Sequence, residues 1–203
     1  MNHRPFAAAP ERNKHAILGV LREELRGVTS VLEIGSGTGQ HAVFLAGELP
    51  HLSWQTSDVV ANHAGIQAWI EEVPHSNVLA PLALDVLVDE PPSGDFDAVF
   101  SANTAHIMSD TAVERMFALV AEVLVDRGVF ALYGPFRQKG FFNTVSNEQF
   151  HASLQAQDAA MGIRDLEELD VLAGKGNLAR QRLYAMPANN HVAVWTKEQG
   201  ANP

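Results

Sequence analysis

The chain has 203 residues, of which 46% are hydrophobic, and it carries a formal net charge of −10. This length suffices for one α/β domain with a well-covered core and is too short for two of ordinary size. The acidic balance disfavours a nucleic-acid partner, which requires a basic surface, and the absence of cysteine excludes disulfides, thiolate metal sites and a cysteine nucleophile.

The opening stretch, MNHRPFAAAPERNK, lacks the apolar core of a secretion signal, and nowhere do about 18 apolar residues run together. We therefore expect a soluble cytoplasmic protein with no membrane partner. The nine histidines are scattered without an H-x-x-x-H pair, so no metal site is predicted.

Strands and helices are predicted to alternate along most of the chain. Strands are expected over residues 30–35, 52–58, 77–85, 96–103 and 128–134, and helices over residues 10–26, 39–49, 62–72 and from 111 onward. Thr111 and Glu114 form a capping-box pattern at the start of the last of these helices.

The C-terminal part of the chain is predicted to be a helix-rich stretch, over residues 147–174, followed by strands over 178–186 and 190–197. The last two strands are joined only by MPANN, so they should pair as an antiparallel hairpin. Together these patterns predict a single α/β domain with a doubly wound sheet of seven strands, mostly parallel, ending in an antiparallel hairpin.

The first strand runs directly into a glycine-rich loop, VLEIGSGTGQ, of the kind that binds nucleotides. Gln40 occupies the position of the third glycine in the dinucleotide fingerprint, and no G-K-[ST] follows, so the dinucleotide and P-loop motifs both fail. What remains is an acidic residue, Glu33, followed by Gly35, Gly37 and Gly39. On its own a glycine loop after a strand is a weak signal.

The pattern E-x-G-x-G-x-G resembles the cofactor loop of class I S-adenosylmethionine (SAM)-dependent methyltransferases, which have a Rossmann-like sheet with a terminal hairpin. The resemblance implies that SAM is the cofactor. It also implies that Glu33, Gly35, Ser36, Gly37 and Gly39 bind the methionine part, where glycines let the backbone approach and the acid suits the ammonium group.

Two further acids are predicted at strand ends, where ligands of open α/β sheets bind. Asp58 ends the second strand, and its carboxylate could accept hydrogen bonds from both ribose hydroxyls. Asp85 ends the third strand, and the resemblance implies that it lies by the adenine amino group with Val86 against the ring. Singly, such a residue is more often a turn former or a helix cap.

The wider chain is similar to one largely uncharacterised methyltransferase-like family found in bacteria and animals. The motifs that carry this similarity span nearly the whole chain: ERNK, EIGSGTGQHA, SANTAHI, LYGPF, SNEQF, IRDLE and MPANN. The chain departs from the pattern at AGKGNLARQR and at LVDRGVF. The resemblance divides the single domain 1–203 into a helical lid segment (1–27), a cofactor-binding core (28–134) and a substrate-side insertion with the hairpin (135–203).

The end of the fourth strand should face the transferable methyl group. It reads SANTAHI rather than the Asn/Asp-Pro-Pro-Tyr/Phe of amino-group methyltransferases, which disfavours nucleic acids and protein glutamine as substrates. Asn103 is a candidate for both cofactor binding and catalysis, and His106 is a candidate base. Equally, His106 could only pack or cap at a helix start.

Three further positions are candidates around an acceptor. Tyr133, a catalytic candidate, and Arg137 flank the end of the fifth strand and could wall the pocket, although Tyr133 could also be a core aromatic. Arg12 and Asn13 of the ERNK motif are lid candidates, with a solvated helix start as the alternative.

The sequence thus favours a SAM-dependent methyltransferase acting on a small molecule, as a monomer or homodimer. A non-catalytic module that binds SAM or S-adenosylhomocysteine (SAH) is the main alternative, and a nucleotide-dependent oxidoreductase is a third.

Overall fold

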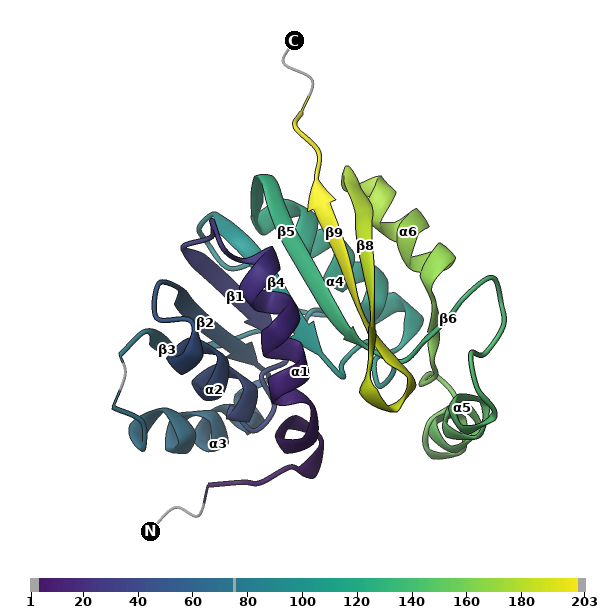
Figure 1. Cartoon of the computed structure of the whole chain (residues 1–203), viewed down its shortest axis with the longest axis horizontal. Coiled ribbons are helices and arrows are strands. Elements are labelled where there is room, and N and C mark those ends of the chain that lie inside the picture. Colours follow the sequence, from purple (N-terminus) through teal and green to yellow (C-terminus); the bar gives the residue numbers. More distant parts are fainter. Residues whose placement is uncertain (1–3, 75, 201–203) are drawn as a thin grey trace.

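The computed structural model describes residues 4–74 and 76–200 (Figure 1). Its main sheet has seven strands in the order β3-β2-β1-β4-β5-β9-β8. The strands from β3 to β5 in this order pair in parallel, whereas β9 is antiparallel to both β5 and β8. The predicted fold class is therefore confirmed.

The predicted helices and strands occur in the expected order. The strands are β1 (Ser30–Ile34), β2 (Ser53–Asp58), β3 (Val78–Ala83), β4 (Phe96–Ala102), β5 (Leu124–Gly134), β6 (Phe136–Arg137), β7 (Arg164–Asp165), β8 (Leu178–Met186) and β9 (Asn190–Lys197). The helices are α1 (Ala8–Glu24), α2 (Gln40–Glu48), α3 (Val60–Glu71), α4 (Asp110–Val123), α5 (Val145–Gln157) and α6 (Leu166–Lys175), with a 3₁₀ turn at Pro187–Asn189.

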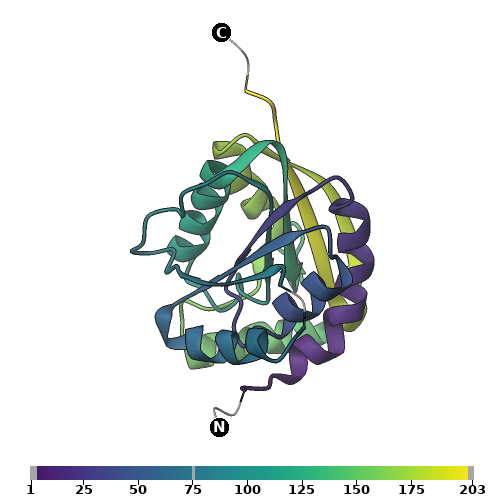
Figure 2. The same cartoon turned by 90° about the vertical axis from the view of Figure 1, so that its left-hand side faces the viewer.

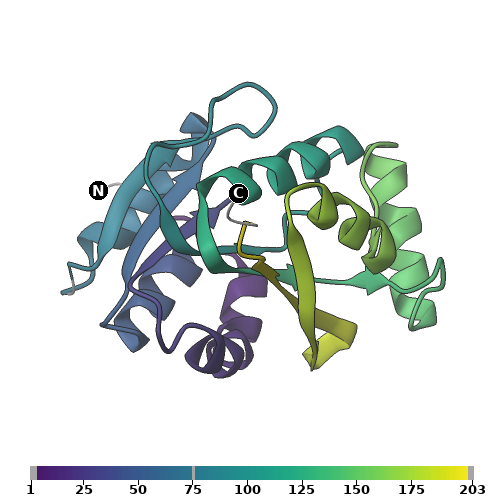
Figure 3. The ribbon, with the colours of Figure 1, turned by 90° about the horizontal axis from the view of Figure 1, so that it is seen from above.

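Helices cover both faces of the sheet, as Figure 3 shows from above. Helices α1 and α2 pack on one face around Trp54 and Phe100, and α4 and α6 pack on the other around Phe117 and Trp195. Because strand β1 is covered on both faces, its burial is continuous from Val31 to Ile34 rather than alternating. The described residues include no helix with the length and apolar character needed to cross a membrane.

Three predicted boundaries are wrong. Strand β3 ends at Ala83, so Asp85 lies in the following turn rather than at the strand end. Strand β5 begins at Leu124, directly after α4, where that residue already pairs with Phe96. The predicted capping box is also wrong, because Ser109 caps α4 by accepting a hydrogen bond from the backbone N–H of Ala112, at 3.2 Å.

The stretch between β5 and β8 forms a small unit that the sequence patterns do not predict in detail. Strands β6 and β7 pair in parallel as a separate two-stranded sheet, flanked by α5 and α6. Asp165 joins the parts of this unit, since it accepts hydrogen bonds from the backbone N–H groups of Gly140 (2.6 Å) and Glu167 (3.1 Å). Residues 147–174 are therefore two helices separated by a short strand.

The terminal hairpin has the predicted bounds and brings its turn to the edge where the parallel strands end (Figures 1 and 2). Ala188 and Asn189 in this turn have φ of 57° and 59°, in the left-handed region. The start of α1 lies at the same edge, so an N-terminal segment and the C-terminal hairpin turn both lie there.

Candidate functional site

The glycine loop leaves strand β1 and is held against β2. The backbone N–H groups of Gly35 and Ser36 both donate to the carbonyl oxygen of Ser57, at 3.0 Å. Gly35 has φ +72°, and a Cβ there would lie 2.6 Å from Cγ2 of Thr104. Gly37 has φ +58°, but a Cβ there would meet nothing within 4 Å. The first glycine thus permits close packing, whereas the second leaves open space above the loop.

The last loop glycine and the residue after it connect the loop to the N-terminal segment. Gly39 caps α2 with φ +89°, and a Cβ there would lie 3.0 Å from Cα of Ile66. Gln40 is buried, and its Oε1 accepts a hydrogen bond from the backbone N–H of Ala7 at 2.6 Å. Its Nε2 has no hydrogen-bond partner in the described part of the chain. The sequence pattern identifies Gln40 only as a residue that does not fit the dinucleotide-binding fingerprint.

Glu33 lies beneath the loop rather than on its open side. Its carboxylate is buried and accepts hydrogen bonds from Oγ of Ser36 (2.9 Å) and Nε1 of Trp54 (3.1 Å). Burial, partly offset by these hydrogen bonds, raises the pKa of Glu33 to about 7. The Oγ of Ser36 in turn accepts from the backbone N–H of Ser57 at 3.2 Å. Glu33 and Ser36 therefore fasten the loop to its neighbouring strand.

Asp58, at the end of β2, binds the loop from the side. One carboxylate oxygen accepts from the backbone N–H of Gly37 at 2.6 Å, and the other accepts from the N–H of Val59 (2.7 Å) and Nδ2 of Asn62 (2.8 Å). A pocket of about 480 Å³ opens here, lined by Gly37, Thr38, Pro5 and residues of α3 that include Ala61 and Asn62.

The predicted adenine residues lie farther along the same edge. Asp85 is half-buried in the turn after β3, where its Oδ1 accepts from the backbone N–H of Leu87 at 3.0 Å. Val86 is also half-buried and packs against the core on the α4 side. In the described structure Asp85 therefore shapes its own turn.

A second pocket, of about 430 Å³, lies at the ends of β4 and β5. It brings together four residues that the sequence singled out and adds part of the hairpin turn. Its lining consists of Ala9, Arg12, Asn13, Asn103, Tyr133, Pro187, Ala188 and Asn190.

Asn103, which directly follows β4, and Tyr133, near the end of the adjacent β5, face this pocket. Asn103 adopts φ 60°, a left-handed conformation that asparagine tolerates better than most residues, and its backbone N–H donates to the carbonyl of Tyr133 at 2.9 Å. Tyr133 is almost fully buried, and burial raises its pKa despite hydrogen bonds of its hydroxyl with Asn13 and Asn190. The phenol is therefore protonated at neutral pH.

A buried histidine, which sequence reasoning missed, holds Asn13 in place. Nε2 of His41, on the first turn of α2, lies 2.7 Å from Oδ1 of Asn13. Burial, together with the charge of Lys14, lowers the pKa of His41 to about 4, so the ring is neutral at pH 7. Because an amide oxygen only accepts, Nε2 carries the proton. The only available signal was the adjacency of histidine to the glycine loop in GQHA.

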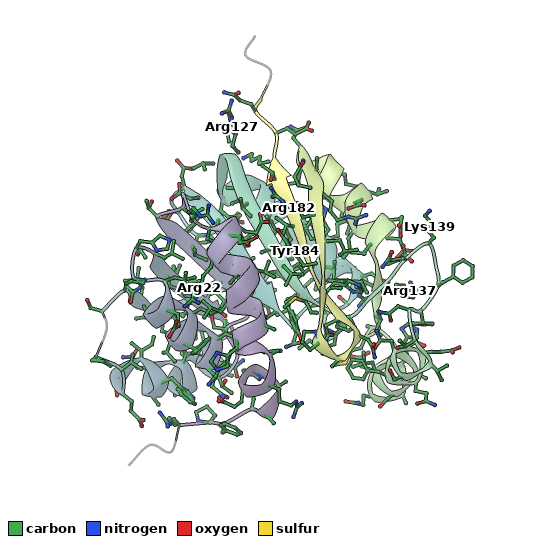
Figure 4. The ribbon with its side chains drawn as sticks, viewed as in Figure 1. Arg22, Arg127, Arg137, Lys139, Arg182 and Tyr184 are labelled. Carbon is green, nitrogen blue, oxygen red and sulfur yellow. The ribbon has the colours of Figure 1, made fainter. Side chains whose placement is uncertain are left out.

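Two predicted residues do not line this pocket. His106 is buried with its ring edge-on to Phe150 at 5.5 Å, and burial lowers its pKa to about 4, with the nearby Arg164 charge adding to the shift. Arg137, on β6, lies over Phe142 and has a carboxylate oxygen of Glu168 at 3.8 Å. Figure 4 shows it on the α5 side of the terminal hairpin, away from α1.

A metal centre would need several ligating side chains close together in residues 4–74 and 76–200. These residues contain no group of three or more His, Asp or Glu side chains that could hold a metal ion. The absence of a metal stays a prediction.

A family model described as "Protein of unknown function (DUF938)" matches residues 4–197. The chain belongs to this family. Its fold is shared with solved methyltransferase structures of low sequence identity. Human N-acetylserotonin methyltransferase in complex with SAM aligns with a TM-score of 0.78 at 11% identity, over 94% of the DUF938 chain and 53% of its own.

Two further structures give the same result. The O-methyltransferase NcsB1 from neocarzinostatin biosynthesis, in complex with SAM and 2-hydroxy-5-methyl naphthoic acid, has a TM-score of 0.77 at 14% identity, covering 93% and 54% of the two chains. The SAM-dependent methyltransferase SibL, in its apo form, has a TM-score of 0.75 at 17% identity, covering 95% and 56%. The DUF938 chain thus has a SAM-methyltransferase fold and spans little more than half the length of these proteins.

Proposed function

We propose that this DUF938 protein is a SAM-dependent methyltransferase that acts on a small-molecule acceptor. The observation that carries the proposal is the arrangement along one edge of the sheet. The glycine loop after β1 has the pocket of Gly37 and Asn62, both hydrogen-bonded to Asp58, on its β2 side and the pocket of Asn103 and Tyr133 on its β4 side. An extended nucleotide ligand lying across the loop would therefore reach from one pocket toward the other.

The described residues fit SAM. The open space over Gly37 admits a ligand close to the backbone, and Oδ2 of Asp58, which accepts one hydrogen bond from Gly37, can accept another from a ribose hydroxyl. Asp85 and Val86 would meet the adenine, and Gly35 and Gly39 would let the loop take its shape. We assign Glu33 and Ser36 a part in cofactor binding through the loop that they fasten.

When bound, SAM supplies a methyl group on a positively charged sulfur. The chain's own contribution is to align the acceptor and to exclude water. Asn103 and the protonated hydroxyl of Tyr133 can hold an acceptor by hydrogen bonds at the β4 edge. We propose the described part of the 1–27 segment as the cover, since Arg12 and Asn13 line the pocket; residues 1–3 lie outside the described residues.

No described residue that lines this pocket is placed to remove a proton from an acceptor. His106 is neutral at pH 7 and could accept a proton, but it packs under Phe150 instead of lining the pocket. We propose that His106 supports the end of β4 and that Arg137 supports the insertion. A base is required only for acceptors that must lose a proton.

The lack of a proton acceptor in the pocket lining favours one alternative function. Because no pocket-lining residue is positioned to accept a proton at neutral pH, the protein could bind SAM or SAH without catalysis, as a sensor or assembly partner. Under this alternative SAH would bind as tightly as SAM and no methyl group would be transferred.

The test is binding followed by turnover. Calorimetry should show SAM and SAH binding to the purified chain and no preference for NAD. Incubation with methyl-labelled SAM and a deproteinised small-molecule extract should then produce SAH and a labelled product. Binding without turnover would select the non-catalytic alternative, whereas a preference for NAD would exclude both.

A further inference from the structure

The pocket of Asn103 and Tyr133 has an unpaired positive charge at its mouth. Arg12 is the sole charged residue in the lining, and in residues 4–74 and 76–200 its side chain forms no ion pair or hydrogen bond. The other basic residues of α1 differ, since Lys14 pairs with Glu11 at 2.5 Å and Arg22 pairs with Glu48 at 2.5 Å. In a chain of net charge −10 an unpaired arginine facing a pocket calls for an anionic partner.

The position of this charge is set by the fold. Ala9, Arg12 and Asn13 lie three and four residues apart, so they share one face of α1, and that face lines the pocket. The hydrogen bond from His41 to buried Asn13 fixes this turn of the helix against α2. Although the Arg12 side chain is exposed, its base is held in place beside the pocket.

The remaining polar groups of the pocket are neutral. The protonated hydroxyl of Tyr133 and the amide of Asn103 provide hydrogen-bond donors, while Pro187 and Ala188 provide an apolar wall. A guanidinium with neutral donors and no carboxylate in the lining matches a carboxylate ligand, which accepts several hydrogen bonds at once.

We propose that Arg12, with Tyr133, forms a carboxylate-binding subsite of the methyltransferase site. This inference rests on the proposed function and deepens it. The carboxylate has two possible sources, the methionine part of the cofactor or a small acidic acceptor, and the two sources make different predictions for one variant.

The test compares Arg12→Gln with wild type by calorimetry, using SAH and 5′-methylthioadenosine, which lacks the amino-acid part. If the cofactor supplies the carboxylate, the variant should bind SAH about 10- to 100-fold more weakly and bind methylthioadenosine as wild type does. If an acceptor supplies it, both affinities should be unchanged. Labelling of the anion-exchanger-retained fraction of a small-molecule extract should then fall about tenfold.

Arg22→Gln is the matched control, because it makes the same change on the same helix at a residue outside the pocket. It should match wild type throughout, and Arg12→Lys should recover part of the lost binding. The proposal is overturned if SAH affinity is unchanged in Arg12→Gln and labelling of the retained fraction is either absent in wild type or undiminished in the variant. A wild-type chain that binds neither SAM nor SAH refutes the proposed function instead.

Discussion

The two sides of the glycine loop differ in how their charged groups are used. On the β2 side both carboxylate oxygens of Asp58 already accept hydrogen bonds, from Gly37 and from Val59 and Asn62. On the β4 side Arg12 has no partner among the described residues. One side is organised by contacts within the chain, whereas the other presents a charge that a ligand can neutralise.

The difference follows from where the residues lie in the sequence. Gly37 and Asp58 are 21 residues apart and belong to neighbouring parallel strands. The β4 side instead combines the first helix with the last hairpin, which are distant in sequence. We infer that the β2 side binds the adenosine part of SAM, and that the β4 side binds the acceptor or a ligand carboxylate. Four substitutions test this contrast.

The largest effect is expected from Gly37→Val, which would block ligand binding on the β2 side of the loop. The new side chain would fill the open space over the loop, and the left-handed φ of +58° adds strain. SAM binding should fall below detection by calorimetry at concentrations that saturate wild type. Gly140→Val is the matched control, because Gly140 also has a left-handed φ and open space but lies in the insertion. Equal loss of binding in both variants would contradict the assignment.

Glu33→Gln tests the role of the buried Glu33 carboxylate, which fastens the glycine loop from beneath. The folded chain retains the Glu33 proton between the ordinary pKa of 4.5 and about 7, while the unfolded chain loses it, so this group reduces stability as pH rises through that window. The variant lacks this loss and should be more stable than wild type at pH 8 by up to about 3 kcal/mol. Urea unfolding at pH 5 and pH 8 measures the difference between the two chains, and a difference independent of pH would refute the buried-acid interpretation.

Asp58→Ala sharpens the contrast by removing the charge on the organised side. Losing its hydrogen bonds should weaken SAM binding by about 1–3 kcal/mol, measured as a rise in Kd by calorimetry. Asp97→Ala is the control, because Asp97 accepts hydrogen bonds from Thr29 and Ser30 at the opposite end of the sheet. That control should lower stability without changing Kd. If Asp58→Ala binds SAM like wild type, the site is misplaced.

Tyr133→Phe should have the smallest effect and should act on the β4 side alone. The ring stays buried and only the hydroxyl is lost, so acceptor kcat/KM should fall by about 0.5–1.5 kcal/mol in transition-state terms. SAM affinity should be unchanged if an acceptor supplies the carboxylate that Arg12 and Tyr133 bind, and should fall by a similar amount if SAM supplies it. Tyr184→Phe uses the only other tyrosine, whose hydroxyl donates to Glu24 outside the pocket (Figure 4). A change in SAM affinity in Tyr133→Phe that Arg12→Gln does not show would contradict the shared subsite.

The same contrast explains what could be predicted from the sequence. Periodicity gave the bounds of β8 and β9, because their alternating residues are enclosed by Asn and Pro. It misplaced the start of α4, because Ser109 and Thr111 are both good capping residues and only the folded backbone decides between them. Strand-end positions pointed to Asp58 and Asn103, since topology alone places them. Nothing local could pair His41 with Asn13, because that contact depends on how α1 packs against α2.

The antiparallel placement of β9 has a consequence for how the protein is made. Strand β9 inserts between β5 and β8, and the turn that precedes it supplies Pro187, Ala188 and Asn190 to the pocket. A chain that ends at β5 contains the glycine loop and Asp58 but lacks the hairpin residues that line the pocket with Arg12. The lining of the pocket of Asn103 and Tyr133 is therefore complete only when synthesis has passed Asn190.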